Sequence, residues 1–271
     1  MQSVRTIEQW PVENAATVVV AAEGEIVGAH GDLDRPFALA SVTKLLTAFA
    51  VHVAVEEGVL ELDDDAGPAG STVRHLLAHA SGLDAAQRTV RAAPGARRIY
   101  SNAGFEVLAE TVEQRSGIPF ADYVRDALLV PLGMTSTTAT GSPAAGAVST
   151  AADLAKFAAE LQRPTLLDPS TLAAATVVAY PGLEGVLPGF GRQRPNDWGL
   201  GFEVRDGKHP HWTGTTSAPA TYGHFGQAGT FVWVDPAAQL ACVALTDRDF
   251  GPWAAQVWPE YTDAVLAERR A

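Results

Sequence analysis

Short runs of β-branched and apolar residues lie near both ends of the chain and predict β-strands there. Residues 17–22 form one such run, and a Glu-Gly turn separates it from a second candidate strand at 25–30, so the two predict a hairpin. Closer to the end, a last amphipathic helix carries Trp253, Val257 and Tyr261 on one face. Four candidate strands precede this helix, at residues 200–205, 221–225, 230–235 and 239–246.

The middle of the chain has the spacing of amphipathic helices. In the first helix, Val42, Leu45 and Phe49 recur on one face, and Gly58 ends the run. Further candidate helices cover residues 72–80, 103–116, 120–130 and 151–161, with a short one starting at 168–169. Residues 181–197 are rich in glycine and proline and are predicted to be an irregular connection.

This order of elements predicts an α+β fold in a single domain over residues 1–271. Because two strands alone do not form a stable sheet, we expect one antiparallel β-sheet built from both chain ends and covered by the first and last helices. The α/β lobe then comprises approximately residues 1–65 and 198–271, with an all-helical lobe inserted at approximately 66–197. Clefts between lobes commonly bind ligands, so the first helix, at the lobe junction, is where a site is expected.

Composition and charge narrow the possible functions. The 271 residues are 47% hydrophobic and 18% charged, which is typical of an ordered globular protein, and the net charge is −12. An acidic chain without clustered Lys and Arg argues against nucleic-acid and anionic-membrane partners. The first residues lack the basic and apolar regions of a secretory signal, so a cytoplasmic protein is predicted, with a secreted protein whose leader has been removed as the alternative.

The first helix carries a pair of residues suited to nucleophilic chemistry. Ser41 and Lys44 are three residues apart, so their side chains lie on one helix face, one turn apart. A neighbouring amine can take the proton of a serine nucleophile, and burial lowers the pKa of a lysine toward that of a useful base. An ordinary capping serine and a solvent-facing lysine are the alternative.

Two further short motifs offer partners for this pair. In Tyr100-Ser101-Asn102, the tyrosine lies at the start of a helix, where a phenol next to a cation can act as an acid or base. The alternative is that Ser101 or Asn102 caps the helix and Tyr100 packs.

The third motif, His224-Phe225-Gly226, lies in a glycine-rich strand. Glycines there let a substrate approach the backbone closely. The backbone N–H of Gln227, together with that of Ser41, is predicted to form an oxyanion hole.

Two groups of residues could be metal ligands, but a structural role or a solvated loop explains each of them better. His75 and His79 are four residues apart, as zinc ligands on a helix are, but no third ligand follows at a suitable spacing. The three carboxylates at 63–65 are typical of a solvated acidic loop. We therefore expect no metal and no organic cofactor.

Taken in order, Ser-x-x-Lys, Tyr-x-Asn and His-x-Gly resemble the motifs of the serine β-lactamase-like, or penicillin-recognising, superfamily. The similarity is closest to its class C β-lactamase, D-alanyl-D-alanine peptidase and family VIII-type esterase branch. It extends over nearly the whole chain, because further stretches are similar to the family's landmarks. These stretches are residues 75–83, 131–137, 149–154 and 199–202.

The resemblance implies roles for the motif residues. Ser41 would be acylated, Lys44 would activate it, and Tyr100 would pass a proton to the leaving group and later activate water. Asn102 would orient Lys44 or a substrate amide. His224 stands where many relatives have a lysine in Lys-Thr-Gly, and a neutral histidine holds a carboxylate less well than a fixed cation does.

The resulting hypothesis is a serine hydrolase that acts through an acyl-enzyme on a small ester or amide. The alternatives are a D-amino-acid peptidase or weak β-lactamase, and a non-catalytic binding module that retains the fold. The expected partner is a small ester, amide or β-lactam substrate, with no nucleic acid and no membrane. The sequence does not indicate an oligomeric state.

Overall fold

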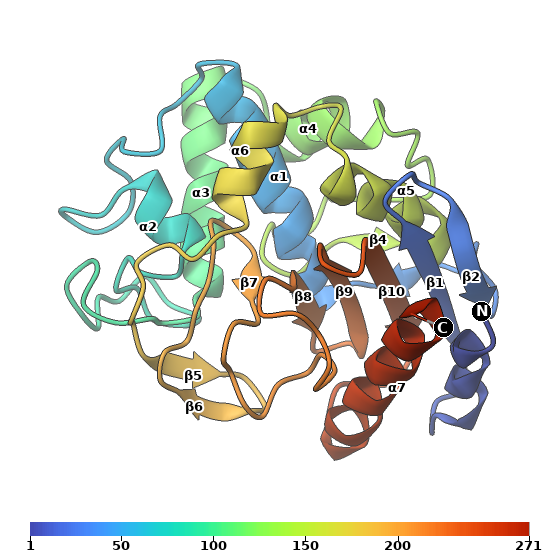
Figure 1. Cartoon of the computed structure of the whole chain (residues 1–271). Coiled ribbons are helices and arrows are strands. Elements are labelled where there is room, and N and C mark those ends of the chain that lie inside the picture. Colours follow the sequence, from blue (N-terminus) through green and yellow to red (C-terminus); the bar gives the residue numbers. More distant parts are fainter. Residues whose placement is uncertain (271) are drawn as a thin grey trace.

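A computed structural model describes residues 1–270 and contains a six-stranded antiparallel sheet (Figure 1). Both chain ends contribute to it, as the sequence predicts. In spatial order the strands are β2 (Ile26–His30), β1 (Ala15–Ala21), β10 (Leu240–Thr246), β9 (Thr230–Asp235), β8 (Tyr222–Gly226) and β7 (Glu203–Val204). The predicted α+β fold with an antiparallel sheet and flanking helices is therefore confirmed.

The two ends of the chain meet where β1 pairs with β10. Ala15 lies opposite Thr246, and the pairing continues to Ala21 opposite Leu240. Almost every residue of these two strands is buried, which explains why both read as continuous apolar runs rather than as alternating ones.

The predicted strand at 200–205 is wrong over its first half. Only Glu203–Val204 forms β7, because the preceding backbone bonds to the helices instead of to β8. The N–H of Leu200 donates to the Ala175 carbonyl, and the N–H of Gly201 donates to the Leu77 carbonyl. The predicted irregular connection at 181–197 also differs, since it contains the small hairpin of β5 (Gly185–Leu187) and β6 (Gly191–Gln193).

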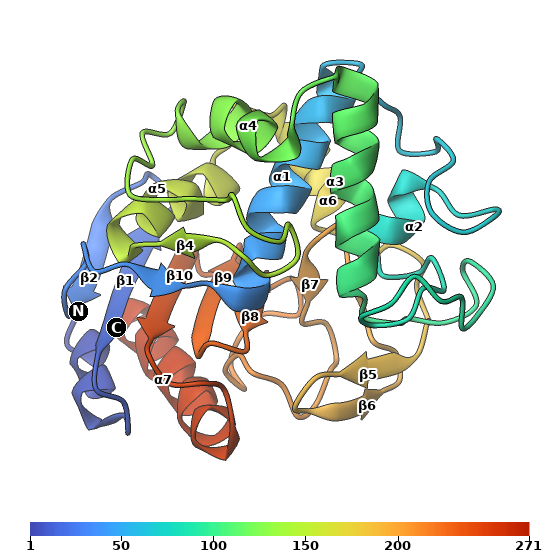
Figure 2. The same ribbon diagram turned by 180° about the vertical axis from the view of Figure 1, so that it is seen from behind.

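Helices cover both faces of the sheet (Figures 1 and 2). On one face α7 (Pro252–Arg270) packs through an aromatic cluster that includes Trp258 and Tyr261, joined by the N-terminal 3-10 helix η1 (Ser3–Gln9). On the other face lie α1 (Thr43–Glu56) and α5 (Ala151–Gln162).

Helix α5 packs directly on the sheet, whereas the sequence predicts its residues to be part of the helical lobe. The Gln162 side chain donates to the Val20 carbonyl at 3.1 Å, and the Tyr222 hydroxyl donates to the Leu161 carbonyl at 2.6 Å. Thr150 caps the helix by accepting from the N–H of Asp153. The covering layer on this face is thus shared between α1 and α5.

The remaining helices stand around α1, away from the sheet. Ser101 caps α3 by accepting from the N–H of Gly104, and Gly117, at a φ of +72°, ends it. Where one helix over 120–130 was predicted, α4 continues into a π-helical turn, η3. The helices are α2 (Val73–Leu77), α3 (Asn102–Ser116), α4 (Phe120–Val124), η3 (Arg125–Leu129) and α6 (Pro169–Ala175).

The short strands β3 (Phe37–Ala38) and β4 (Val148–Ser149) pair just before α1 and α5 begin. Among the described residues, no helix is both long and apolar enough to cross a membrane.

Candidate active site

Ser41 lies in a 3-10 turn, η2 (Ala40–Val42), immediately before α1 begins. The backbone is fixed there from two sides. The Leu39 N–H donates to the Ala147 carbonyl at 2.9 Å, and the Leu39 carbonyl accepts from the Thr230 hydroxyl at 2.8 Å. Ala40 has a φ of +44°, a conformation that non-glycine residues rarely adopt. Ser41 is thus held at the junction between the sheet and the central helix.

Lys44 lies one turn further, with its amine enclosed by the protein. Its Nζ is 3.4 Å from Ser41 Oγ, and donates to Asn102 Oδ1 at 2.6 Å and to the Ala144 carbonyl at 2.8 Å. Burial lowers the Lys44 pKa from 10.5 to about 7, although the nearby carboxylate of Glu106 raises it in part. A neutral amine that donates to Asn102 and Ala144 still has a lone pair available for the Ser41 proton.

Tyr100 completes the contacts of the serine. Its hydroxyl donates to Ser41 Oγ at 2.8 Å, and Lys44 Nζ lies 4.8 Å from the centre of its ring. Burial raises the Tyr100 pKa above its usual value, so the resting group is a neutral phenol. Ser101 and Asn102 are the cap and first residue of α3, and this geometry fixes Tyr100 at the mouth of that helix.

His224 faces the same region from β8. Its Nδ1 is 2.6 Å from the Phe225 carbonyl, and because a carbonyl only accepts, Nδ1 carries the hydrogen. Nε2 is therefore an acceptor, and it is buried without a hydrogen-bond partner within residues 1–270. Burial lowers the His224 pKa to about 3, helped by the charge of Lys44, so the imidazole is neutral.

A small cavity of about 200 Å³ connects these groups. Lys44 lies behind Ser41 and contacts it directly. Gly226 does not line this cavity and packs against the turn before Ser41 instead. A Cβ at this position would be 2.2 Å from the Leu39 carbonyl oxygen and 3.2 Å from the Ala40 Cβ. The cavity is lined by Ser41, Tyr100, Asn102, Leu187, Pro188, Trp198, Glu203, His224, Phe225 and Gln227.

The structure thus brings most of the predicted site residues together. Gln227 follows directly after β8, and its carbonyl accepts from the N–H of Phe250 at 2.7 Å. The predicted oxyanion role of the Gln227 and Ser41 N–H groups remains a prediction. Gly226 serves the close packing of β8 against the turn before Ser41, instead of facing the cavity.

Sequence reasoning missed a buried ionic cluster beside the cavity. The carboxylate of Glu203, on β7, accepts from Lys208, from His211 at 2.9 Å and from Trp212. Burial raises the Glu203 pKa, but Lys208 and His211 outweigh it and lower the pKa below its usual range. No motif or spacing in the sequence pairs Glu203 with Lys208.

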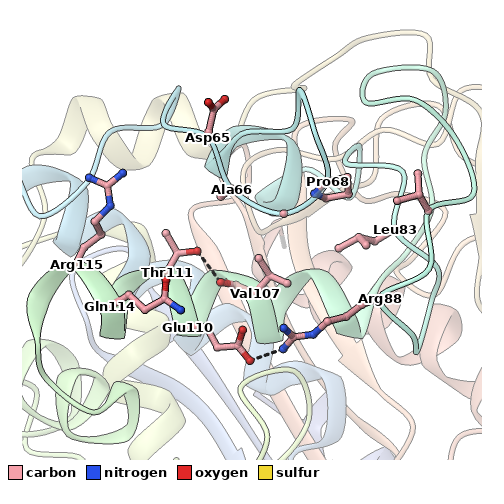
Figure 3. A pocket seen from close by; sticks show the side chains of 12 residues that line it. Asp65, Ala66, Pro68, Leu83, Arg88, Val107, Glu110, Thr111, Gln114 and Arg115 are labelled. Carbon is pink, nitrogen blue, oxygen red and sulfur yellow. Dashed lines mark hydrogen bonds and ion pairs between the residues drawn. The ribbon is translucent and has the colours of Figure 1, made fainter.

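A larger groove of about 500 Å³ lies along α3 (Figure 3). Arg88 and Glu110 pair across it, and the Thr111 hydroxyl donates to the Val107 carbonyl. None of the three motifs contributes to its lining, so the smaller cavity at Ser41 is the candidate active site.

Comparisons with known proteins agree with this arrangement. Residues 5–267 match the family model described as Beta-lactamase. A crystal structure of a β-lactamase from Mycobacterium bovis is 55% identical, covers 99% of this chain and 100% of its own, and has a TM-score of 0.97.

Two curated relatives are more distant. A penicillin-binding protein of Bacillus subtilis (strain 168) is 29% identical over 45% of this chain. The D-alanyl-D-alanine-carboxypeptidase/endopeptidase AmpH of Escherichia coli (strain K12) is 30% identical over 41% of it. The match spans little more than a third of these relatives, 37% and 38% of their lengths. On the family match over nearly its whole length, the chain belongs to the Beta-lactamase family of serine hydrolases.

Proposed function

We propose that this protein is a serine hydrolase that forms an acyl-enzyme at Ser41 from small, uncharged esters. The observation that carries the proposal is the position of Ser41 Oγ, within reach of both Lys44 Nζ at 3.4 Å and the Tyr100 hydroxyl at 2.8 Å. An activated nucleophile requires such a base and a second group that handles protons.

In acylation, Ser41 Oγ attacks the ester carbonyl carbon while its proton passes to the neutral amine of Lys44. The tetrahedral intermediate collapses when the bond to the leaving alkoxide breaks, and that oxygen takes the Tyr100 proton. The phenolate then recovers a proton from the Lys44 ammonium. No net proton is gained or lost, and the products are an alcohol and the acyl-enzyme.

In deacylation, water attacks the acyl carbon and gives a proton to the Tyr100–Lys44 pair. Collapse of the second intermediate expels Ser41 Oγ, which takes that proton back, and releases the acid. In both intermediates the carbonyl oxygen carries a negative charge. We propose that the backbone N–H groups of Ser41 and Gln227 stabilise this charge by donating hydrogen bonds to the oxygen.

The charges around the cavity favour the ester over the peptidase and β-lactamase alternatives. Among the described residues, the two lysines near the cavity already have partners: Lys44 bonds to Asn102 and Ala144, and Lys208 bonds to Glu203. His224 is neutral. A substrate carboxylate would therefore meet no free positive charge among the described residues that line the cavity.

Labelling of Ser41 tests the proposal directly. After incubation with a fluorophosphonate or a chromogenic ester, intact-mass and peptide mass spectrometry should find the adduct on Ser41. Ser41→Ala should lose the adduct and reduce ester turnover by about 10⁴-fold or more. Ser170→Ala, at an exposed serine on α6, serves as the control and should retain both.

A lack of adduct on Ser41 with every fluorophosphonate, ester and penicillin tried would contradict the proposal. That result would favour the binding-module alternative.

A further inference from the structure

Two residues that line the cavity each carry a buried polar atom with no hydrogen-bond partner in the described chain. One is the acceptor Nε2 of His224, and the other is the indole Nε1–H donor of Trp198. Both residues line the cavity, and their rings lie 5.3 Å apart, centre to centre. Most buried side-chain polar atoms in native proteins are paired, so two unpaired ones beside a nucleophile require an explanation.

The other walls show which ligand group would fit. Leu187 and Phe225 are apolar, and Glu203 is a buried carboxylate whose oxygens already accept from Lys208, His211 and Trp212. An anionic group would face Glu203 without a free cation. A group that both donates and accepts, and carries no charge, matches an unpaired acceptor and an unpaired donor on two neighbouring rings.

We propose, resting on the function proposed above, that the preferred acyl group carries a hydroxyl near its carbonyl, which donates to His224 Nε2 and accepts from Trp198 Nε1–H. The acyl part is placed here because it stays bound to Ser41 through both half-reactions, whereas the alcohol departs after the first. Both atoms are shielded from solvent, so the proposal requires the surrounding aromatic side chains to move apart for the hydroxyl to reach them.

Matched p-nitrophenyl esters test this substrate class. The 3-hydroxybutanoate is compared with the isosteric 3-methylbutanoate, and the 2-hydroxypropanoate with the 2-methylpropanoate. Each kcat/KM is divided by the rate of alkaline hydrolysis of the same ester, which removes the intrinsic reactivity of the hydroxy compound. For at least one pair, the wild-type protein should prefer the hydroxy ester by about tenfold, the ratio expected for one net hydrogen bond.

His224→Phe keeps a flat ring but removes the acceptor, so the ratio should fall to about one. Trp198→Phe removes the donor and should lower the ratio as well. His30→Phe, at a histidine on β2 that pairs with Glu8 at the sheet edge, is the control and should keep the wild-type ratio.

The outcomes separate this inference from the function on which it rests. If no ester acylates Ser41, the proposed function fails. If Ser41 is acylated by both members of each pair, a normalised ratio of one or less for both pairs overturns the hydroxyl assignment. A ratio that persists in His224→Phe overturns it too. A wild-type ratio of one overturns the assignment whatever the variants do, and if His224→Phe does not fold, a wild-type ratio that persists in Trp198→Phe overturns it instead.

Discussion

At the scale of single residues, the protonation of Lys44 governs the proposed acylation. Only the neutral amine accepts the Ser41 proton, and the Lys44 pKa is lowered to about 7 by burial. Below that pH the ammonium predominates, so kcat/KM should fall tenfold for each pH unit on the acid side. Above it, the rate should level off. An ordinary exposed lysine, with a pKa near 10.4, would give no plateau near neutral pH.

Glu106 provides a way to move this profile. Its carboxylate raises the Lys44 pKa by stabilising the ammonium form. We expect Glu106→Gln to lower that pKa, which shifts the acid limb of the kcat/KM profile to lower pH and increases activity at pH 6. The measurement is the pH dependence of p-nitrophenyl ester cleavage.

Glu110→Gln is the matched control for this prediction. Glu110 lies one turn further along α3 and pairs with the exposed Arg88. Removing its charge should therefore leave the acid limb of the kcat/KM profile at the wild-type pH. An unchanged limb in Glu106→Gln, or a shift to higher pH, would contradict the assignment of Lys44 as the group that titrates.

The sequence predicted the site residues that belong to the three short motifs and missed those outside any motif. Ser41 and Lys44 meet only if their segment forms a helical turn, and the apolar pattern of this segment predicts a helix. Glu106, Ala144 and Glu203 come from separate elements, and nothing in their local sequence marks them as neighbours of Lys44 or His224. A carboxylate such as Glu203 looks like an ordinary strand residue until its three donors are in place.

At the scale of elements, the contact between β8 and the turn before Ser41 positions the nucleophile. Gly226 ends β8 against Leu39 and Ala40, and the Thr230 hydroxyl on β9 holds the Leu39 carbonyl. A side chain at position 226 would collide with the backbone, which cannot give way as the end of a flexible side chain can. The glycine of the third motif is therefore explained by packing.

We expect Gly226→Ala to impair both stability and activity. The added Cβ would approach the Leu39 oxygen to 2.2 Å, so Leu39 to Ser41 must shift. Overpacking of this kind lowers the free energy of unfolding by about 1–3 kcal/mol. Displacement of Ser41 should lower the acylation rate by more than this loss of stability alone would. Urea unfolding and fluorophosphonate labelling rates measure the two effects.

Gly207→Ala is the control, because a Cβ at this position meets no atom within 4 Å. It should change neither quantity measurably. A Gly226→Ala protein with wild-type labelling and stability would show that this contact does not position Ser41.

The predicted element boundaries were wrong where tertiary contacts outweighed the local pattern of apolar residues. Residues 200–202 are apolar enough for a strand, but their backbone bonds to α2 and α6 instead of to β8. The β5–β6 hairpin was missed because its glycines indicated turns. By contrast, the strands with long β-branched runs, such as β9, were predicted within a residue or two because burial in the sheet requires those side chains.

At the scale of the whole molecule, the sheet couples the two ends of the chain. β1 finds its partner β10 more than 200 residues away, so the sheet forms only when both ends are present. Such long-range pairing is typical of slow, cooperative folding. The prediction of a sheet from both ends came from the pattern alone and is confirmed, as is membership of the family that the three motifs resemble.

Native-state hydrogen exchange should show this coupling. We expect amides of β1, β9 and β10 to exchange with a common free energy close to that of global unfolding, because the sheet opens as one unit. Amides of the β5–β6 hairpin, which lies outside the sheet, should exchange through smaller openings. Early exchange of β1 while β10 stays protected would contradict a single cooperative sheet.

The same pairing determines how the protein would resist being pulled by its ends. The N-terminal segment enters β1 at Ala15, and β10 leaves the sheet at Thr246, directly opposite. The N-terminal helix η1 and helix α7 are tied together where Glu268 accepts from the N–H groups of Gln2 and Ser3. Once the hydrogen bonds of Glu268 break, the force acts on Ala15 and Thr246 together. The strand pair then separates one residue pair at a time from this end. The protein would therefore yield to a small force along this axis, despite the deep burial of both strands.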